Sequence, residues 1–357
     1  MDKYYVQMVA QNYLKNVINK PCNVHDKFLH SLTKEEFADG FNELTRLICQ
    51  LYSDIAKTPA DFNMTLKKAE DAKSTDYANS NASFLRMPNL LLLLGATSSL
   101  ESNGVLTVDC GLLLDNAKKL KITGLPFLLS KLKDYGFDIS DFGKVPKTGE
   151  SLTVVYIDNR YLTTALKSMA DALLELTKGD LRNSKNDYFY LMNPALLENE
   201  TVIEPNLDMD SFSHVLTETQ RDCVSVLHRI VADITKHSVH LGQLMRNDWS
   251  CTYTNKKSKK VLMKLLVEQS NLSVKLNLQN INQYISVVDD MPEKIQNSVC
   301  NDGWECGKCN PRCAGGFAFE MNGTAHNKCH CGSFVFGDLT DEDLKNLEKL
   351  LILEMKA

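Results

Sequence analysis

A cluster of cysteines near the carboxyl end of the chain limits what the sequence can fold into more than any other feature. Six of the 11 cysteines lie within residues 300–331. The core of the cluster reads Cys306-Gly-Lys-Cys309-Asn-Pro-Arg-Cys313, and Cys329-His-Cys331 follows after fifteen further residues. Zn²⁺ takes four soft ligands in a tetrahedron, and two thiolates separated by two residues can wrap one ion from a tight turn. The spacing therefore predicts a metal-binding module over residues 300–331.

Four of these thiols are the expected ligands, because zinc in a structural site is four-coordinate. We expect Cys306, Cys309, Cys313 and Cys329 to bind the ion, with Cys331 and Cys300 as alternates. His326 and His330 are further possible ligands, although a nearby histidine more often supports such a site from outside. All-thiolate ligation leaves no open position, so a structural zinc is expected. An iron–sulfur cluster also uses four thiolates, but the spacing does not match the bacterial ferredoxin run.

The segment between the two halves of the cluster carries a hairpin signal. Phe317, Phe319 and Met321 alternate with other residues and lead into Asn322-Gly323. An Asn-Gly pair between alternating apolar residues is typical of a two-residue hairpin turn. Such a hairpin would return the second group of cysteines to the side of the first.

The cysteine pattern, the Phe-x-Phe-x-Met-Asn-Gly run and the segment Phe334–Phe336 resemble a carboxy-terminal module of uncharacterised bacterial proteins. In those proteins the cysteines similarly precede a hairpin and a terminal helix. The likeness covers roughly 60 to 100 residues, and it extends from about Trp249 onward if the preceding strand pair is included. It implies a shared metal module and brings no activity with it.

Composition narrows the class of protein. The chain has 357 residues, enough for two or three domains, and a net charge of −5, which does not favour non-specific nucleic-acid binding. The other five cysteines are scattered singly, as is usual in a reducing compartment. The start of the chain lacks a signal-peptide pattern, and the longest apolar run, around Leu90–Leu94, is too short to span a membrane. We therefore expect a cytoplasmic protein that does not bind membranes.

The coarse pattern predicts a multi-domain α+β protein. We expect a helical region over 1–75, a winged-helix-like domain over 86–185, and an α+β domain over 211–357 that contains the zinc module. The polar stretch Ser74–Ser83 is the expected linker after the first region.

The middle segment has the element order of a winged helix. The expected elements are a helix from Pro88 to Leu100, a strand over Val105–Val108, helices over Gly111–Leu120 and Leu125–Tyr135, and a hairpin of Phe137–Ile139 with Leu152–Ile157. A recognition helix should offer polar side chains in its first turn, whereas this one begins Leu-Pro-Phe-Leu-Leu. DNA reading is therefore the weaker interpretation of the segment.

Periodicity predicts the elements of the last region. They are a long helix from Thr217 to Met245, strands over Cys251–Tyr253, Val261–Val267 and Leu272–Leu278, helices over Ile281–Asp289 and from Pro292, and a final helix capped by Thr340 with Asp343. On the long helix, Asp233, His237 and His240 would share one stripe, the weak candidate for acid–base or metal chemistry.

No nucleotide-binding, metalloprotease or hydrolase motif is present in the sequence. We therefore expect a non-enzymatic interaction or regulatory protein with a structural zinc site and a protein partner. One alternative is a nucleic-acid-binding regulator that uses the winged segment and the lysine-rich turn Asn255–Lys260. The other is an enzyme of unrecognised type.

Overall fold

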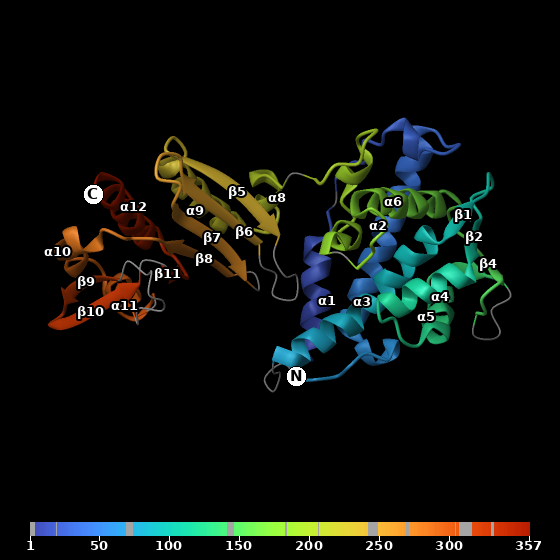
Figure 1. Ribbon diagram of the computed structural model, residues 1–357, viewed down its shortest axis with the longest axis horizontal. Coiled ribbons are helices and arrows are strands. Elements are labelled where there is room, and N and C mark those ends of the chain that lie inside the picture. The colour runs from blue at the N-terminus through green and yellow to red at the C-terminus, as the bar shows by residue number, and fades with distance from the viewer. Residues whose placement is uncertain are drawn as a thin grey trace. The chain divides into compact units, whose positions relative to one another are not determined.

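The computed structural model describes residues 4–18, 20–68, 74–140, 146–182, 184–205, 207–241, 249–268, 271–303, 305–306, 316–329 and 332–357. The chain divides into two compact units, Met1–Asn206 and Leu207–Ala357 (unit 1 and unit 2), which we describe separately. The described residues form a mixed α+β structure of twelve α-helices and three antiparallel sheets (Figure 1). Within these residues, no helix combines the length and the apolar character that crossing a membrane requires.

Unit 1 is mainly helical. Its helices are α1 (Tyr5–Asn16), α2 (Lys34–Lys57), α3 (Ser74–Ala96), α4 (Cys110–Lys119), α5 (Leu125–Lys133), α6 (Tyr161–Thr177) and α7 (Asp187–Tyr190). Short 3₁₀ turns lie at Asp26–Phe28, Pro59–Phe62, Ser184–Asn186 and Pro194–Leu197. Helices α1, α2, α3 and α6 pack on one another and bury the core of the unit.

Helix α2 begins with a capping box. The Thr33 hydroxyl accepts from the Glu36 backbone N–H (3.2 Å), and the Glu36 carboxylate accepts from the Thr33 N–H (2.9 Å). One turn later, Gly40 lies against the start of α6. A Cβ atom there would stand 2.4 Å from the Tyr161 carbonyl oxygen, so only glycine permits this close packing of the two helices.

The expected linker Ser74–Ser83 is instead the first part of helix α3, and this prediction was wrong. Ser80 and Ser83 are buried, and the helix continues through Pro88 to Ala96. Pro88, expected to start a helix, therefore lies inside one. The five leucines that follow it, Leu90–Leu94, are all fully buried, and this burial stabilises the helix against the cost of its polar and proline residues.

The sheet of unit 1 has the strand order β1-β2-β4-β3. Its strands are β1 (Ser98–Leu100), β2 (Leu106–Asp109), β3 (Phe137–Ile139) and β4 (Ser151–Tyr156). The predicted hairpin of β3 with β4 is confirmed, with Phe137 opposite Tyr156. Strand β1 was not predicted. The division of this unit into 1–75 and 86–185 stays a prediction.

Unit 2 is built on a five-stranded sheet with the order β11-β8-β7-β6-β5. Its strands are β5 (Thr235–Leu241), β6 (Trp249–Asn255), β7 (Val261–Glu268), β8 (Asn271–Leu276) and β11 (Phe334–Gly337). Its helices are α8 (Met209–Ser213), α9 (Glu218–Val231), α10 (Ile285–Asp289), α11 (Glu293–Asn301) and α12 (Asp341–Lys356), with a 3₁₀ turn at Ile281–Gln283. Helices α9 and α12 contact each other. Along β8, Leu272, Val274 and Leu276 are buried, as their alternation predicts.

The predicted long helix over Thr217–Met245 was wrong in its second half. Helix α9 ends at Val231, and Thr235–Leu241 is strand β5. Thr235 and Val239 of this strand are buried, and their side chains fit a pleated surface. Pairing with β6 along all seven residues of β5 overrides the helical spacing of the sequence. Residues 242–248 lie outside the described part of the chain.

The terminal helix α12 is anchored at both ends. At its start, the predicted capping box of Thr340 with Asp343 is confirmed, and Lys294 of α11 lies 2.9 Å from the same carboxylate. Near its end, Glu354 accepts four hydrogen bonds, from the backbone of Gln279 and from the backbone and side chain of Asn280 (3.1 Å each), and from the Tyr284 hydroxyl (2.7 Å). This carboxylate holds the helix to the end of β8.

Candidate metal centre

The hairpin predicted inside the cysteine cluster is confirmed. Strands β9 (Gly316–Met321) and β10 (Thr324–Cys329) pair in antiparallel register, with Gly316 opposite Cys329. Asn322 and Gly323 form the turn with φ angles of 52° and 70°. Positive φ at both central residues is typical of the two-residue turn that the Asn-Gly pair favours.

The hairpin is attached to unit 2 through its aromatic face. Phe317, Phe319 and Met321 are buried in the hydrophobic core of the unit. The ring of Phe317 lies 6.4 Å from that of Phe334 on strand β11. Since side chains alternate along a strand, Gly316 is directed to the opposite face. The end of the hairpin that carries Cys329 is thus held in place by packing on the other side.

Cys306 is brought to this same end of the hairpin. Its backbone N–H donates to the Asn327 carbonyl (2.8 Å), and Glu305 forms an antiparallel bridge with Lys328. A Cβ atom on Gly316 would lie 2.6 Å from the Cβ of Cys306 and 2.3 Å from the Lys328 carbonyl oxygen. Gly316 therefore neighbours Cys306 by close approach and Cys329 by register. Gly316, which has no side chain, is thus a common neighbour of two of the four predicted ligands.

Most of the other predicted ligands lie outside the described residues. Cys309, Cys313 and the alternate Cys331 lie outside the described residues, as does His330. Cys300 lies on α11, half-buried against the hydrophobic core. Within the described ranges, no three His, Cys, Asp or Glu side chains are grouped so that they could hold a metal ion, and no disulfide joins the cysteines. The described part thus contains two of the four expected ligands beside Gly316, Cys306 and Cys329.

A buried cation accompanies these thiols. The Lys328 side chain is only 3% exposed, and its ammonium group lies 2.6 Å from the Glu305 carboxylate, which is 66% exposed. This hydrogen bond lowers the pKa of Glu305. Burial raises the pKa of the Cys300 thiol, and the charge of Lys328 partly opposes that rise.

His326 shows one feature that the sequence does not reveal. Its ring stacks on Phe319 with the centres 5.1 Å apart, and its Nε2 atom is buried with no hydrogen-bond partner among the described residues. A buried ring nitrogen without a partner is costly and is commonly satisfied by water or an ion. Because His326 lies three residues from Cys329 on β10, the two side chains are directed to opposite faces of the hairpin. His326 therefore does not complete the ligand set around Cys329.

The proposed stripe of Asp233, His237 and His240 does not exist, because these residues do not share a helix. Asp233 is exposed in the turn after α9, and the two histidines lie on β5 at an odd spacing, which directs them to opposite faces. His240 is paired with the Ser238 hydroxyl (3.0 Å). His237 instead contacts His228 of α9 and Tyr253 of β6. No local pattern could have revealed this meeting, since it depends on the register of β5.

The lysine-rich turn joins β6 to β7, as expected, but only part of its charge is available. The Lys256 ammonium group donates to the Asp233 carbonyl (2.7 Å), and that of Lys260 donates to the Gln279 side chain (2.9 Å). Lys257 and Lys259 are exposed. The turn is thus a half-tethered surface loop.

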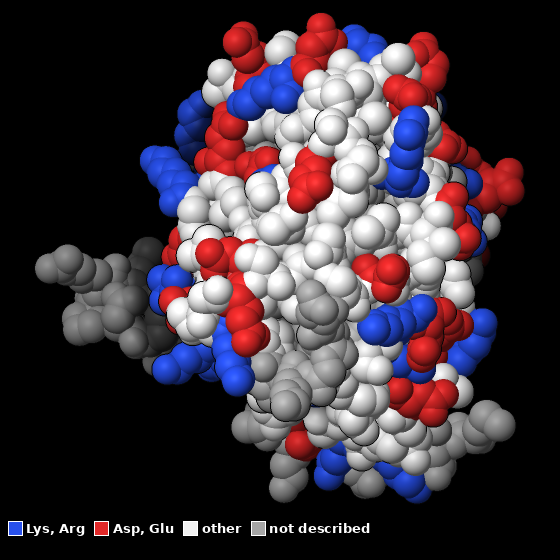
Figure 2. All heavy atoms as spheres, turned by 90° about the vertical axis from the view of Figure 1, so that its right-hand side faces the viewer, with Lys and Arg blue, Asp and Glu red and all other residues white. Residues whose placement is uncertain are grey.

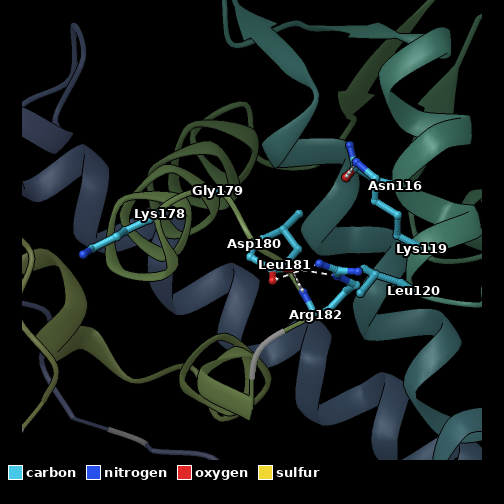
Figure 3. Close-up of a pocket in the computed structure, with 8 residues that line it drawn as sticks. All are labelled: Asn116, Lys119, Leu120, Lys178, Gly179, Asp180, Leu181 and Arg182. Atoms are coloured by element: carbon cyan, nitrogen blue, oxygen red, sulfur yellow. Dashed lines mark hydrogen bonds and ion pairs between the residues drawn. The ribbon is translucent and has the colours of Figure 1, made fainter.

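A shallow pocket of about 270 Å³ in unit 1 lies where helices α4 and α6 end (Figure 3). It is lined by Asn116, Lys119, Leu120, Lys178, Gly179, Asp180, Leu181 and Arg182. The Asp180 carboxylate pairs with Arg182 through two hydrogen bonds of 3.0 and 3.2 Å, and Lys178 is directed away from them. Cations are the ordinary complement of the carbonyl groups at helix ends. The charge of this pocket is thus explained without a ligand.

None of the known protein families, curated proteins and solved structures compared with the chain matches it. The candidate metal centre therefore rests on the spacing of its cysteines and on the geometry of the hairpin.

Proposed function

We propose that this chain is a non-enzymatic interaction or regulatory protein whose unit 2 is stabilised by a structural zinc ion. The ligands are Cys306, Cys309, Cys313 and Cys329, and Cys331 or Cys300 is the alternate. The observation that supports the proposal is that Cys306 and Cys329 both neighbour Gly316, the first by close approach and the second by strand register. Zinc binding would add its free energy to the folding of a hairpin that has little core of its own.

The first experiment measures metal content in protein purified without chelator or added metal. About one zinc per chain is expected, with about four thiols that react only after denaturation, because a structural zinc protects four ligands. If the protein contains iron and inorganic sulfide, the site holds an iron–sulfur cluster and not zinc. The absence of any metal, together with six rapidly reacting thiols in 300–331, would contradict the proposal.

Serine variants assign the ligands. Cys306→Ser is expected to remove the metal, since a hydroxyl is a much poorer zinc ligand than a thiolate. Cys49→Ser is the matched control, because Cys49 is a half-buried thiol on α2 of unit 1. Cys300→Ser tests whether Cys300 is a ligand. If the variant retains its zinc, Cys300 only packs on the core. Equal zinc content in all three variants would contradict the assignment.

The middle of unit 1 supports a protein partner more than DNA. Its order of helices α3, α4 and α5, and the strand order β2-β4-β3, agree with the winged-helix-like prediction. However, the helix in the recognition position, α5, is tied to the 3₁₀ turn Pro59–Phe62. The Lys131 ammonium group lies 5.2 Å above the Phe62 ring, and Arg86 donates to the carbonyls of Asn63 (2.6 Å) and Thr123 (3.4 Å). These contacts occupy groups that phosphates would need.

The surface charge agrees with this interpretation. On the face seen in Figure 2, blue and red side chains are interspersed, and the described residues form no extended basic area there. Non-specific DNA binding requires several Lys or Arg side chains that pair with phosphates together.

A salt titration separates the two functions. We expect no duplex-DNA binding that weakens steeply with salt, and no change when Lys256, Lys257, Lys259 and Lys260 are replaced by Ala. Strong salt-dependent binding that these four substitutions abolish would establish the nucleic-acid alternative instead.

A further inference from the structure

Two histidines from different elements of unit 2 face each other at the edge of its sheet. His228 lies on the last turn of α9 and His237 on the edge strand β5. Their ring centres are 5.3 Å apart and their planes are inclined by 79°. Neither residue belongs to the cysteine-rich hairpin.

The His228 ring is held in one orientation by Tyr253, the residue opposite His237 in the pairing of β5 with β6. The Nδ1 atom of His228 lies 3.0 Å from the Tyr253 hydroxyl, which in turn donates to the Met209 sulfur (3.8 Å). In the tautomer that binds a metal through Nε2, the His228 Nδ1–H donates to the Tyr253 oxygen, and the hydroxyl proton is directed to the Met209 sulfur. Histidines that bind metals nearly always donate their other ring N–H in this way.

The spacing of the rings fits a shared metal ion. With a metal–nitrogen bond of ~2.1 Å, the ion lies ~3.2 Å from each ring centre, so two imidazoles bound at 90–110° have centres about 4.5–5.2 Å apart. The observed 5.3 Å exceeds this range by about 0.1 Å, which a small rotation of one ring removes. His237 is exposed, so its ring can turn a nitrogen towards the ion while His228 stays fixed.

The surroundings favour the uncharged form of His228 and leave coordination positions of a bound ion unfilled. Partial burial, and then the proximity of His237, lower the pKa of His228, so its imidazole is uncharged and able to bind a metal at neutral pH. Because the described residues include no third ligand of the His, Cys, Asp or Glu type at this point, the other coordination positions are left for water or for a donor from outside.

We propose that His228 and His237 form a second metal site, which binds a borderline divalent ion such as Ni²⁺, Cu²⁺ or Zn²⁺ through two imidazoles. Imidazole is the ligand that these ions share. Tyr253 is the positioning residue. A bound ion links the end of α9 to the edge of the sheet. The site is independent of the cysteine centre and of the function proposed for it.

The test is a Ni²⁺ titration of the purified full chain, in which the histidine ring resonances are followed by NMR. Each of the eight histidines of the chain gives its own ring resonances. Paramagnetic Ni²⁺ broadens the resonances of the histidines that bind it, so the ligands can be identified. We expect saturable broadening of His228 and His237, while His326 and His330 beside the cysteines stay sharp. Broadening of those two histidines alone would place Ni²⁺ at the cysteine centre and overturn the proposal.

Three variants complete the test. His237→Ala should weaken Ni²⁺ binding by about tenfold or more, whereas His240→Ala, on the same strand and also exposed, should leave it unchanged. Tyr253→Phe should weaken binding about tenfold although both imidazoles remain, because His228 loses the group that orients it. If His237→Ala and His240→Ala weaken binding equally, the chain binds Ni²⁺ through scattered surface histidines and the proposal fails.

Discussion

Unit 1 and unit 2 bury their cores in different ways. In unit 1, aromatic rings from three separate helices meet: Phe84 of α3 lies 4.7 Å from Tyr13 of α1 and 5.0 Å from Tyr52 of α2. In unit 2, the core combines residues of the strands with residues of helices α9, α11 and α12, and its hairpin β9–β10 contributes only one face. Unit 1 thus closes its core with an aromatic cluster between helices, whereas unit 2 has an element that is attached to its core by one face.

The two units can be observed independently. Both tryptophans of the chain, Trp249 and Trp304, belong to unit 2, so tryptophan fluorescence reports on that unit alone. Helical circular dichroism is dominated by unit 1, which contains the long helices α2, α3 and α6. Each substitution below should therefore change one signal and leave the other in place.

The largest effect is expected for Phe84→Ala. Removing a fully buried ring from this aromatic cluster should lower the free energy of unfolding of unit 1 by about 3–5 kcal/mol. Denaturant titration should show an earlier loss of helical circular dichroism and an unchanged fluorescence transition. Leu112→Ala on α4 is the control, because that side chain is 53% exposed and should change stability little. Parallel shifts of both signals would mean that the units unfold together.

Glu354→Ala tests the carboxylate that anchors helix α12 in unit 2. It leaves the four donors around this carboxylate without their acceptor, so unit 2 should lose about 2–3 kcal/mol. The fluorescence transition should move to lower denaturant while the helical signal of unit 1 stays in place. Glu348→Ala on the same helix is the control. An equal loss in both variants would show that the effect comes from helix charge and not from this anchor.

The pH dependence of unit 1 is expected to involve Asp187. Burial raises the pKa of this carboxyl group to about 7, above its ordinary value, while a hydrogen bond from Tyr13 (3.4 Å) partly opposes the rise. The folded state thus favours the neutral acid. Its contribution to stability is complete below about pH 4 and is lost as the pH rises towards 7, with a slope of at most ~1.4 kcal/mol per pH unit.

Asp187→Asn should remove this dependence. The difference between the unfolding free energies of the variant and the wild type, measured from pH 4 to 8, should grow with pH in favour of the variant. A constant difference would show that Asp187 ionises normally in the folded state.

The smallest effect is expected for Tyr156→Phe. The Tyr156 hydroxyl donates to Glu43 of α2 (2.9 Å) and so joins this helix to strand β4. Losing one hydrogen bond to a partly exposed carboxylate should cost about 1 kcal/mol in unit 1. Val155→Ala, whose side chain lies on the other face of the same strand, is the comparison. If Tyr156→Phe leaves the denaturant transition of the helical circular dichroism unchanged, this hydrogen bond does not stabilise unit 1.

The sequence predicted those features that local chemistry determines. Asn322-Gly323 indicated the hairpin turn, and Thr340 with Asp343 indicated the start of α12, because both act over a few residues. The predictions failed where contacts between residues far apart in the sequence determine the secondary structure. Ser80 has no local reason to be buried in a helix, and Thr235 is extended because it pairs with β6. The same holds for the candidate sites: spacing suggested the cysteines, but only the fold reveals that Gly316 lies beside Cys306 and that His228 meets His237.

The pairing of β11 with β8 has a consequence for how fast unit 2 forms. Phe334 lies opposite Leu276, so the sheet is completed only when the whole segment between them, cysteines included, has been looped out. Closing a long loop slows folding because its entropy is lost before the new contacts form. An ion that first ties Cys306 to Cys329 shortens the stretch of free chain that has to close. In kinetic experiments, zinc should then speed the refolding of unit 2 as well as slow its unfolding.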